Sequence, residues 1–124
     1  MNGSEIFEIH EYMVILRQLE RMDFGGAEIQ LRGIVRCLGD GAMLDVYCLE
    51  EGSPFPQPVV DLEARKGVIF LPFRDIHVLV DLLRNEGPLY AHLRSDRLAW
   101  TSITTSREPV GEGEEDRSAR PQQP

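Results

Sequence analysis

The most regular hydrophobic pattern in the chain lies between residues 27 and 49. Apolar residues there alternate with charged and amide side chains, which is the period of two expected for a half-buried strand. Asp40-Gly41 interrupts the alternation and is typical of a two-residue β-turn, which needs positive φ at both positions. The predicted hairpin opposes two apolar pairs and one pair of opposite charge: Val35 with Val46, Cys37 with Leu44, and Arg36 with Asp45.

A second pattern, with spacings of three and four residues, predicts one amphipathic helix over 73–86. Pro72 suits the start of this helix, and Gly87 followed by Pro88 suits its end. The apolar stripe of the helix consists of Phe73, Ile76, Leu79, Val80 and Leu83.

The remaining segments indicate further strands. Residues 5–22 fit both a helix and a strand, and the β-branched and aromatic run over 12–16 favours a strand over 6–20. The prolines of segment 51–58 predict a loop, followed by short strands over 59–64 and 68–71.

Alternation over 89–106 predicts a last hairpin that turns at Ser95-Asp96. A two-residue loop pairs Leu93 with Leu98 and places small Ala91 opposite large Trp100. These elements together predict an α+β domain over 1–106, with an antiparallel sheet of six or seven strands and one amphipathic helix packed on one face. Pro, Gly and charged residues dominate 107–124, which predicts a disordered acidic tail.

Composition narrows the classes of partner. The 124 residues fit one domain, and the net charge of −8 disfavours nonspecific binding to phosphate backbones. The last 18 residues hold five acidic and three basic side chains, so most of this acidity lies in the domain itself. The longest apolar run, 12–16, falls far short of the about 20 residues that a membrane helix needs. The N-terminus has no secretory signal pattern, so we expect a cytoplasmic protein without membrane contact. Twelve of the thirteen basic residues are arginine, from which we expect a bacterial source.

The chain carries no recognisable set of catalytic or metal-ligating residues. Its three histidines are scattered, and it has no P-loop, no nucleophile elbow and no dinucleotide-binding glycine pattern. Cys37 and Cys48 lie four positions apart along the predicted hairpin, which is too far for a disulfide. We therefore expect no enzyme, no catalytic residue, no cofactor and no metal site.

One face of the last hairpin suggests nucleic-acid binding. Aromatic, imidazole and guanidinium side chains on one sheet face can stack on bases and neutralise phosphates. Arg94 and Arg97 flank the predicted turn and repel each other unless an anion lies between them. The alternative is a solvated strand face with no ligand. The candidate residues are Tyr90, His92, Arg94, Arg97 and Thr101, joined by Arg65 and Lys66 from a neighbouring turn.

The order of four strands and a helix over 27–86 resembles one PUR repeat of the PUR/PC4/Whirly class of single-stranded nucleic-acid-binding proteins. The local match is the apolar strand 68–71, Pro72 and the helix stripe that follows. The resemblance covers about half of the chain and implies single-stranded DNA or RNA as ligand and a homodimer as assembly. The first turn, usually basic in such repeats, here reads Gly39-Asp40-Gly41.

The predicted sheet also has an apolar outer face. In the hairpin register Leu38 faces Met43 and Ile34 faces Tyr47, and the alternation adds Leu49, Ile69 and Leu71 to the same face. Such a patch indicates either a subunit interface or a surface covered by the 88–105 hairpin or the N-terminal segment. The sequence thus predicts a non-enzymatic binding or regulatory module that self-associates as a homodimer and contacts a protein partner. The alternative is a single-stranded DNA- or RNA-binding protein that uses the last hairpin.

Overall fold

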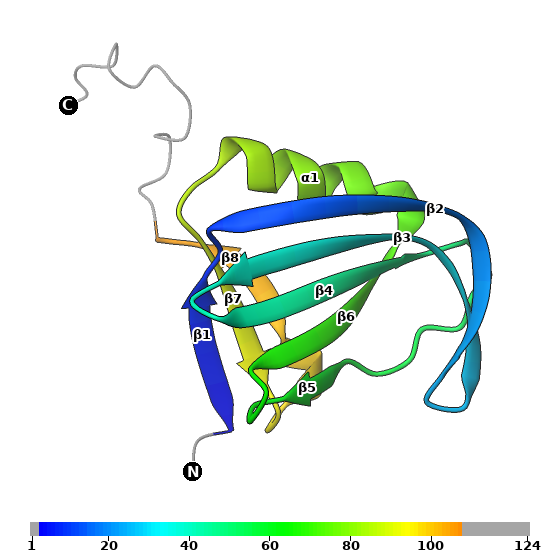
Figure 1. Ribbon diagram of the computed structural model, residues 1–124, viewed down its shortest axis with the longest axis horizontal. Helices are drawn as coiled ribbons and strands as arrows, with labels where there is room; N and C mark the ends of the chain where they lie inside the picture. Colours follow the sequence, from blue (N-terminus) through cyan, green and yellow to red (C-terminus); the bar gives the residue numbers. More distant parts are fainter. Residues whose placement is uncertain (1–2, 108–124) are drawn as a thin grey trace.

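The structure, a computed structural model that describes residues 3–107, consists of eight strands, one α-helix and two short 3₁₀ helices (Figure 1). The elements are β1 (Ser4–Glu8), β2 (Glu11–Phe24), β3 (Ala27–Gly39), β4 (Ala42–Leu49), β5 (Val59–Asp61), β6 (Lys66–Pro72), η1 (Phe73–Asp75), α1 (Ile76–Asn85), β7 (Leu89–Arg94), η2 (Leu98–Trp100) and β8 (Ser102–Thr105). The predicted α+β class, with a single α-helix packed on a sheet, is confirmed. The predicted tail lies outside the described residues, apart from Arg107.

The strands form two sheets, so the prediction of a single antiparallel sheet of six or seven strands is wrong. One sheet has five strands in the order β2-β3-β4-β6-β5, and the other has three in the order β1-β7-β8. The larger sheet is mixed, because β6 runs parallel to β4 while β5 pairs with β6 from outside. After β4 the 50–58 loop carries the chain to the sheet edge, where β5 forms, and β6 then inserts between β5 and β4. The apolar pattern of β6 does not indicate that it pairs with β4 in parallel.

The β3–β4 hairpin has the predicted register. Val35 pairs with Val46, Arg36 with Asp45 and Cys37 with Leu44. Asp40 and Gly41 form the turn, with φ values of 53° and 77°. Both cysteines are free and buried, as the register predicts.

The helical pattern is confirmed with one refinement, since its first turn is the 3₁₀ helix η1 and α1 begins at Ile76. The end is defined by Glu86, whose backbone N–H donates to the carbonyl of Leu82. The predicted stripe lies on the packed side: Leu79 is buried, and the other four residues pack against the main core. Within residues 3–107, no helix has the length and apolar character needed to cross a membrane.

Segment 5–22 is extended, as the β-branched run favours, but the single strand expected over 6–20 is two strands, β1 and β2, interrupted at Ile9 and His10 and belonging to different sheets. β1 pairs with β7, whereas β2 pairs with β3. The β2–β3 register shifts between Leu16 and Glu20, and such an irregularity bends a strand. The part of the β2–β3 hairpin beyond Leu16, toward its turn, therefore curves away from the sheet plane, as the right side of Figure 1 shows.

The predicted register of the last hairpin is wrong. Ala91 pairs with Ile103 instead of Trp100, and β8 begins only at Ser102. The connection is closed by η2, in which the N–H of Trp100 donates to the carbonyl of Arg97. Trp100 consequently lies off the ladder and is 56% exposed.

The main core lies between the two sheets and α1. It contains residues of both sheets and of the helix: Phe7, Val35, Cys37, Ala42, Leu44, Val46, Cys48, Leu79, Ala91 and Leu93. Ile69 and Leu71 pack against this core, so their predicted place on the outer face is wrong. The run 68–71 is apolar throughout, and an uninterrupted apolar run does not show which of its residues face which side.

Candidate functional site

The predicted interface residues lie on the outer face of the five-stranded sheet, and the chain itself covers part of this face. Phe24, at the end of β2, forms edge-to-face contacts with Tyr47 and Phe70, with ring centroids 5.8 and 5.2 Å apart. Ile34 is 5% exposed in the small core beneath this aromatic group. The sequence left two candidates for covering the outer face, the 88–105 hairpin and the N-terminal segment. At this end of the face the cover is the N-terminal segment, through the bent end of β2.

An ion pair divides the outer face. The Arg36 guanidinium donates to both carboxylate oxygens of Asp45, at 2.8 and 2.9 Å. Asp45 is 4% exposed, and its hydrogen bonds and charge raise the pKa of Arg36 above the ordinary value. The other two predicted interface residues, Leu38 and Met43, are half-buried beyond this pair.

The outer face of the three-stranded sheet carries three of the predicted nucleic-acid-binding residues. Tyr90, His92 and Arg94 are half-buried and alternate with buried residues of β7. His92 Nε2 lies 2.9 Å from the hydroxyl of Thr104. Burial, and then the charge of Arg94, lower the pKa of His92 below its ordinary value of 6.5, which favours the neutral ring on this face.

An exposed tryptophan joins this face. The guanidinium carbons of Arg94 and Arg97 lie 5.2 and 4.6 Å from the ring centroid of Trp100. Asp96 lies between the two arginines in the sequence and accepts two hydrogen bonds from Arg94, at 2.9 and 3.0 Å. We call Trp100, Arg94 and Arg97 the indole platform. Trp100 was not among the predicted site residues, because the alternation over 89–106 makes it a ladder partner of Ala91.

The other predicted members of that site have structural roles or lie elsewhere. Thr101 is 6% exposed, and its hydroxyl accepts a hydrogen bond from the backbone N–H of Arg94 at 3.1 Å. Arg65 donates to Glu5 and to the carbonyl of Asp40. Since Glu5 pairs with buried Leu93, this contact lies on the inner side of the sheet. Exposed Lys66 follows Arg65 at the start of β6.

The outer edge of β2 is open. Within residues 3–107, no strand pairs with that edge, and four apolar side chains of β2 are exposed: Met13 (49%), Val14 (38%), Leu16 (68%) and Leu19 (44%). These four residues were not among the predicted site residues, because segment 5–22 fits both a helix and a strand. The uninterrupted run 12–16 was the available signal.

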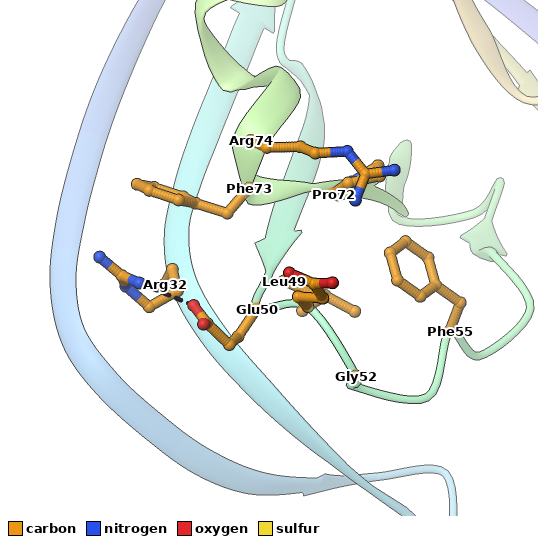
Figure 2. A pocket seen from close by; sticks show the side chains of 9 residues that line it. Arg32, Leu49, Glu50, Gly52, Phe55, Pro72, Phe73 and Arg74 are labelled. Atoms are coloured by element: carbon orange, nitrogen blue, oxygen red, sulfur yellow. Dashed lines mark hydrogen bonds and ion pairs between the residues drawn. The ribbon is translucent and has the colours of Figure 1, made fainter.

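A cavity of about 330 Å³ lies between the 50–58 loop and the start of the helix (Figure 2). Arg32 donates to Glu50 at 2.7 Å, and its guanidinium lies 4.5 Å from the ring centroid of Phe73. Figure 2 shows Phe55 on the opposite side from Phe73 and Arg74 above the opening. The cavity therefore combines aromatic walls with charges of both signs.

A second, more apolar groove of about 450 Å³ lies between α1 and strands β6 and β8, with Val78 and Ile103 in its lining. Within the described range 3–107, no three His, Cys, Asp or Glu side chains gather in a way that could hold a metal ion. Comparison with known proteins gives no match to a family model, to a curated protein or to a solved structure.

Proposed function

We propose that this chain is a non-enzymatic binding module that recognises a protein partner, first of all a second copy of itself, along the open edge of β2. The observation that carries the proposal is the length and apolar character of that edge. β2 has 14 residues and four exposed apolar side chains. An open strand edge presents unpaired backbone N–H and C=O groups, and these can bind a strand of another chain.

The other sheet edges support the choice of β2 by contrast. β5 has three residues, β8 has four and β1 has five. Short edge strands are one of the ways in which proteins avoid edge-to-edge pairing. Monomeric proteins rarely leave a long apolar edge unprotected, so β2 is the edge most suited to a partner strand.

The sheet faces are less suited to self-association than this edge. The outer face of the larger sheet is closed at one end by Phe24, Tyr47 and Phe70 and divided by the Arg36–Asp45 pair. The inner faces of both sheets form the main core. The homodimer expected from the sequence is therefore proposed at an edge, rather than at the patch formed by Ile34, Leu38, Met43 and Tyr47.

Light scattering coupled to size-exclusion chromatography tests the proposal on the full chain. We expect a dimer at micromolar concentration that dissociates on dilution. Leu16→Asp places a charge at the most exposed apolar position of β2 and is expected to yield a monomer. Val78→Asp is the matched control, because Val78 is 60% exposed on α1 and lines the groove beside β8, which contains no residue of β2. A wild-type chain that stays monomeric at every concentration contradicts the proposal.

A second candidate function is single-stranded nucleic-acid binding at the indole platform. It is favoured by the exposure of Trp100 beside two guanidiniums, because exposed aromatic rings and arginines stack on unpaired bases. The acidic net charge of −8 opposes it.

Trp100 is the single tryptophan of the chain, so its fluorescence reports directly on this site. Titration with mixed-sequence DNA and RNA oligonucleotides at low salt should quench the emission if bases stack there. Arg97→Glu should abolish the quenching, and added salt should weaken it. Unchanged emission at low salt excludes the platform as a nucleic-acid site.

A further inference from the structure

We infer that two copies of this chain join through antiparallel pairing of their β2 strands about a two-fold axis at Val14, so that Val14 of one copy lies opposite Val14 of the other. This inference rests on the proposed function and specifies its partner and register. It makes one continuous sheet of the two five-stranded sheets. A two-fold contact of this kind uses the same surface on both copies, and the contact closes after two subunits.

The straight part of β2 sets the length of the contact. Residues 11–16 pair with β3 without interruption, and the register shifts only after Leu16. Beyond this point the strand bends, so it no longer offers a flat edge. A contact centred on Val14 uses the flat segment and the one residue that follows it, Arg17.

On the side of the sheet that faces α1, the pairing is wholly apolar. Val14 meets Val14, and each Tyr12 meets Leu16 of the second copy. These residues lie on the α1 side because Tyr12 and Val14 pair with Cys37 and Val35, which are buried in the main core. The pairing covers Val14 and Leu16, which are 38% and 68% exposed in the isolated chain. Aromatic and β-branched cross-strand pairs stabilise antiparallel sheets.

On the opposite side, apolar pairs are flanked by opposite charges. Each Met13 meets Ile15 of the second copy, and each Glu11 meets Arg17. The symmetry produces the Glu11–Arg17 pair twice. In the isolated chain Arg17 contacts Glu20 at 2.5 Å, and its side chain is still 41% exposed. A guanidinium has five N–H donors, so Arg17 can bind Glu11 as well.

Neighbouring registers lack this complementarity. Moving the axis to Met13 places Glu11 opposite Ile15 and Arg17 opposite Ile9. Moving it to Ile15 places Glu11 opposite Leu19 and Arg17 opposite Met13. Either shift leaves four charges opposite apolar side chains, so the charges select the register centred on Val14.

A cysteine at the axis tests the register. In an antiparallel pair the facing Cα atoms lie about 4.5 or 5.5 Å apart, and both spacings permit a disulfide. Val14→Cys treated with diamide should therefore form a covalent dimer. The native thiols should not compete, because Cys37 and Cys48 are buried and burial raises the pKa of both to about 12.

Leu19→Cys is the matched control on the same edge. The two copies of residue 19 would lie roughly 34 Å apart in this register, at about 3.4 Å per residue. Leu19 is 44% exposed, so a cysteine there is accessible to the oxidant. It should not form a covalent dimer under conditions that cross-link Val14→Cys.

Charge exchange provides a second, independent measurement. Glu11→Arg and Arg17→Glu should each raise the dissociation constant of the dimer about tenfold or more, because each brings like charges together twice. The double variant Glu11→Arg/Arg17→Glu should restore it to within about threefold. Sedimentation of the full chain measures all four proteins.

The outcomes separate the inference from the proposed function. Cross-linking at Val14 but not at Leu19, with rescue by the double variant, supports the register. A wild-type dimer without that cross-link and without rescue overturns the register and leaves self-association standing. A wild-type monomer overturns both.

Discussion

The β3–β4 and β7–β8 hairpins differ in how the chain turns between their strands. The β3–β4 hairpin turns through two residues, Asp40 and Gly41, and its strands have 13 and 8 residues. Between β7 and β8 the chain passes through segment 95–101, which contains η2, and β8 has four residues. The first hairpin is a central part of the core, whereas the second carries the exposed Trp100.

The difference shows what a tight turn does to the residues beside it. A two-residue turn fixes the register, and the register assigns every following side chain to one face. The residues of β3 and β4 are therefore committed to packing and ion pairing. The residues of a longer connection have no strand partner, so Trp100 and Arg97 are free to contact each other on the protein surface. Substitutions in the two hairpins should accordingly have unequal effects on stability.

The largest effect is expected at the tight hairpin, for Gly39→Ala. A Cβ atom at Gly39 would lie 1.9 Å from the backbone carbonyl oxygen of Glu8, and the contact involves main chain that cannot rotate away. We expect the free energy of unfolding to fall by about 3 kcal/mol. Urea unfolding followed by circular dichroism measures it, at one protein concentration because self-association contributes to stability.

Gly87→Ala is the control for this experiment. Nothing lies within 4 Å of a Cβ atom built at Gly87. We expect its effect to stay within about 0.5 kcal/mol. If Gly39→Ala and Gly87→Ala have the same free energy of unfolding, the close approach between Gly39 and Glu8 does not contribute to stability. The expected difference in stability effects between the two hairpins would then lose its main support.

Asp45→Ala should come next, still within the tight hairpin. It removes the buried partner of Arg36, whose side chain is 35% exposed. Because water can reach the unpaired guanidinium, we expect a loss of about 2 kcal/mol, less than for a fully buried charge. Arg36→Met should cost more than Asp45→Ala, since it leaves the buried carboxylate of Asp45 without a partner. If the double variant costs no more than either single one, the two side chains act as one unit.

The parts of the fold that could be predicted from the sequence are those with a local signal. Asp40-Gly41 fixes the β3–β4 register, and the stripe from Phe73 to Leu83 fixes the helix. The division into two sheets has no such signal, because it depends on β1 meeting β7 across most of the chain. Ser95-Asp96 resembles a tight turn. In the structure the hydroxyl of Thr101 accepts the hydrogen bond of the Arg94 backbone N–H, and the pairing of β8 with β7 begins only at Ser102.

The candidate sites follow the same rule. Alternation correctly places Tyr90, His92 and Arg94 on one face, since they belong to one strand. It does not place Arg65, which reaches the inner side of the sheet through Glu5. The open edge of β2 is a property of strand order, and strand order follows from contacts between distant segments.

A smaller effect is expected in the longer connection, for Thr101→Val. This substitution keeps the shape of the buried side chain and removes the acceptor for the N–H of Arg94. We expect a loss of about 1 kcal/mol in the free energy of unfolding and a shift in the emission of Trp100. Trp100→Ala should cost less than Thr101→Val, because the ring is 56% exposed. The reverse order would mean that the indole platform is part of the core.

The smallest effect concerns His92 and should appear as a pH dependence. Burial and Arg94 lower the pKa of the folded-state ring below 6.5, while the unfolded chain keeps the ordinary value. As the pH falls through 6.5, the unfolded state binds its proton first, so the unfolding free energy declines until the folded ring also titrates. Between about pH 8 and pH 5, the wild type should therefore lose more stability than His92→Gln. Proton NMR of the ring should show its pKa rising toward 6.5 in Arg94→Gln, since one of its two causes is removed. An unchanged pKa in that variant would assign the whole shift to burial, and would separate His92 from the charges of the indole platform.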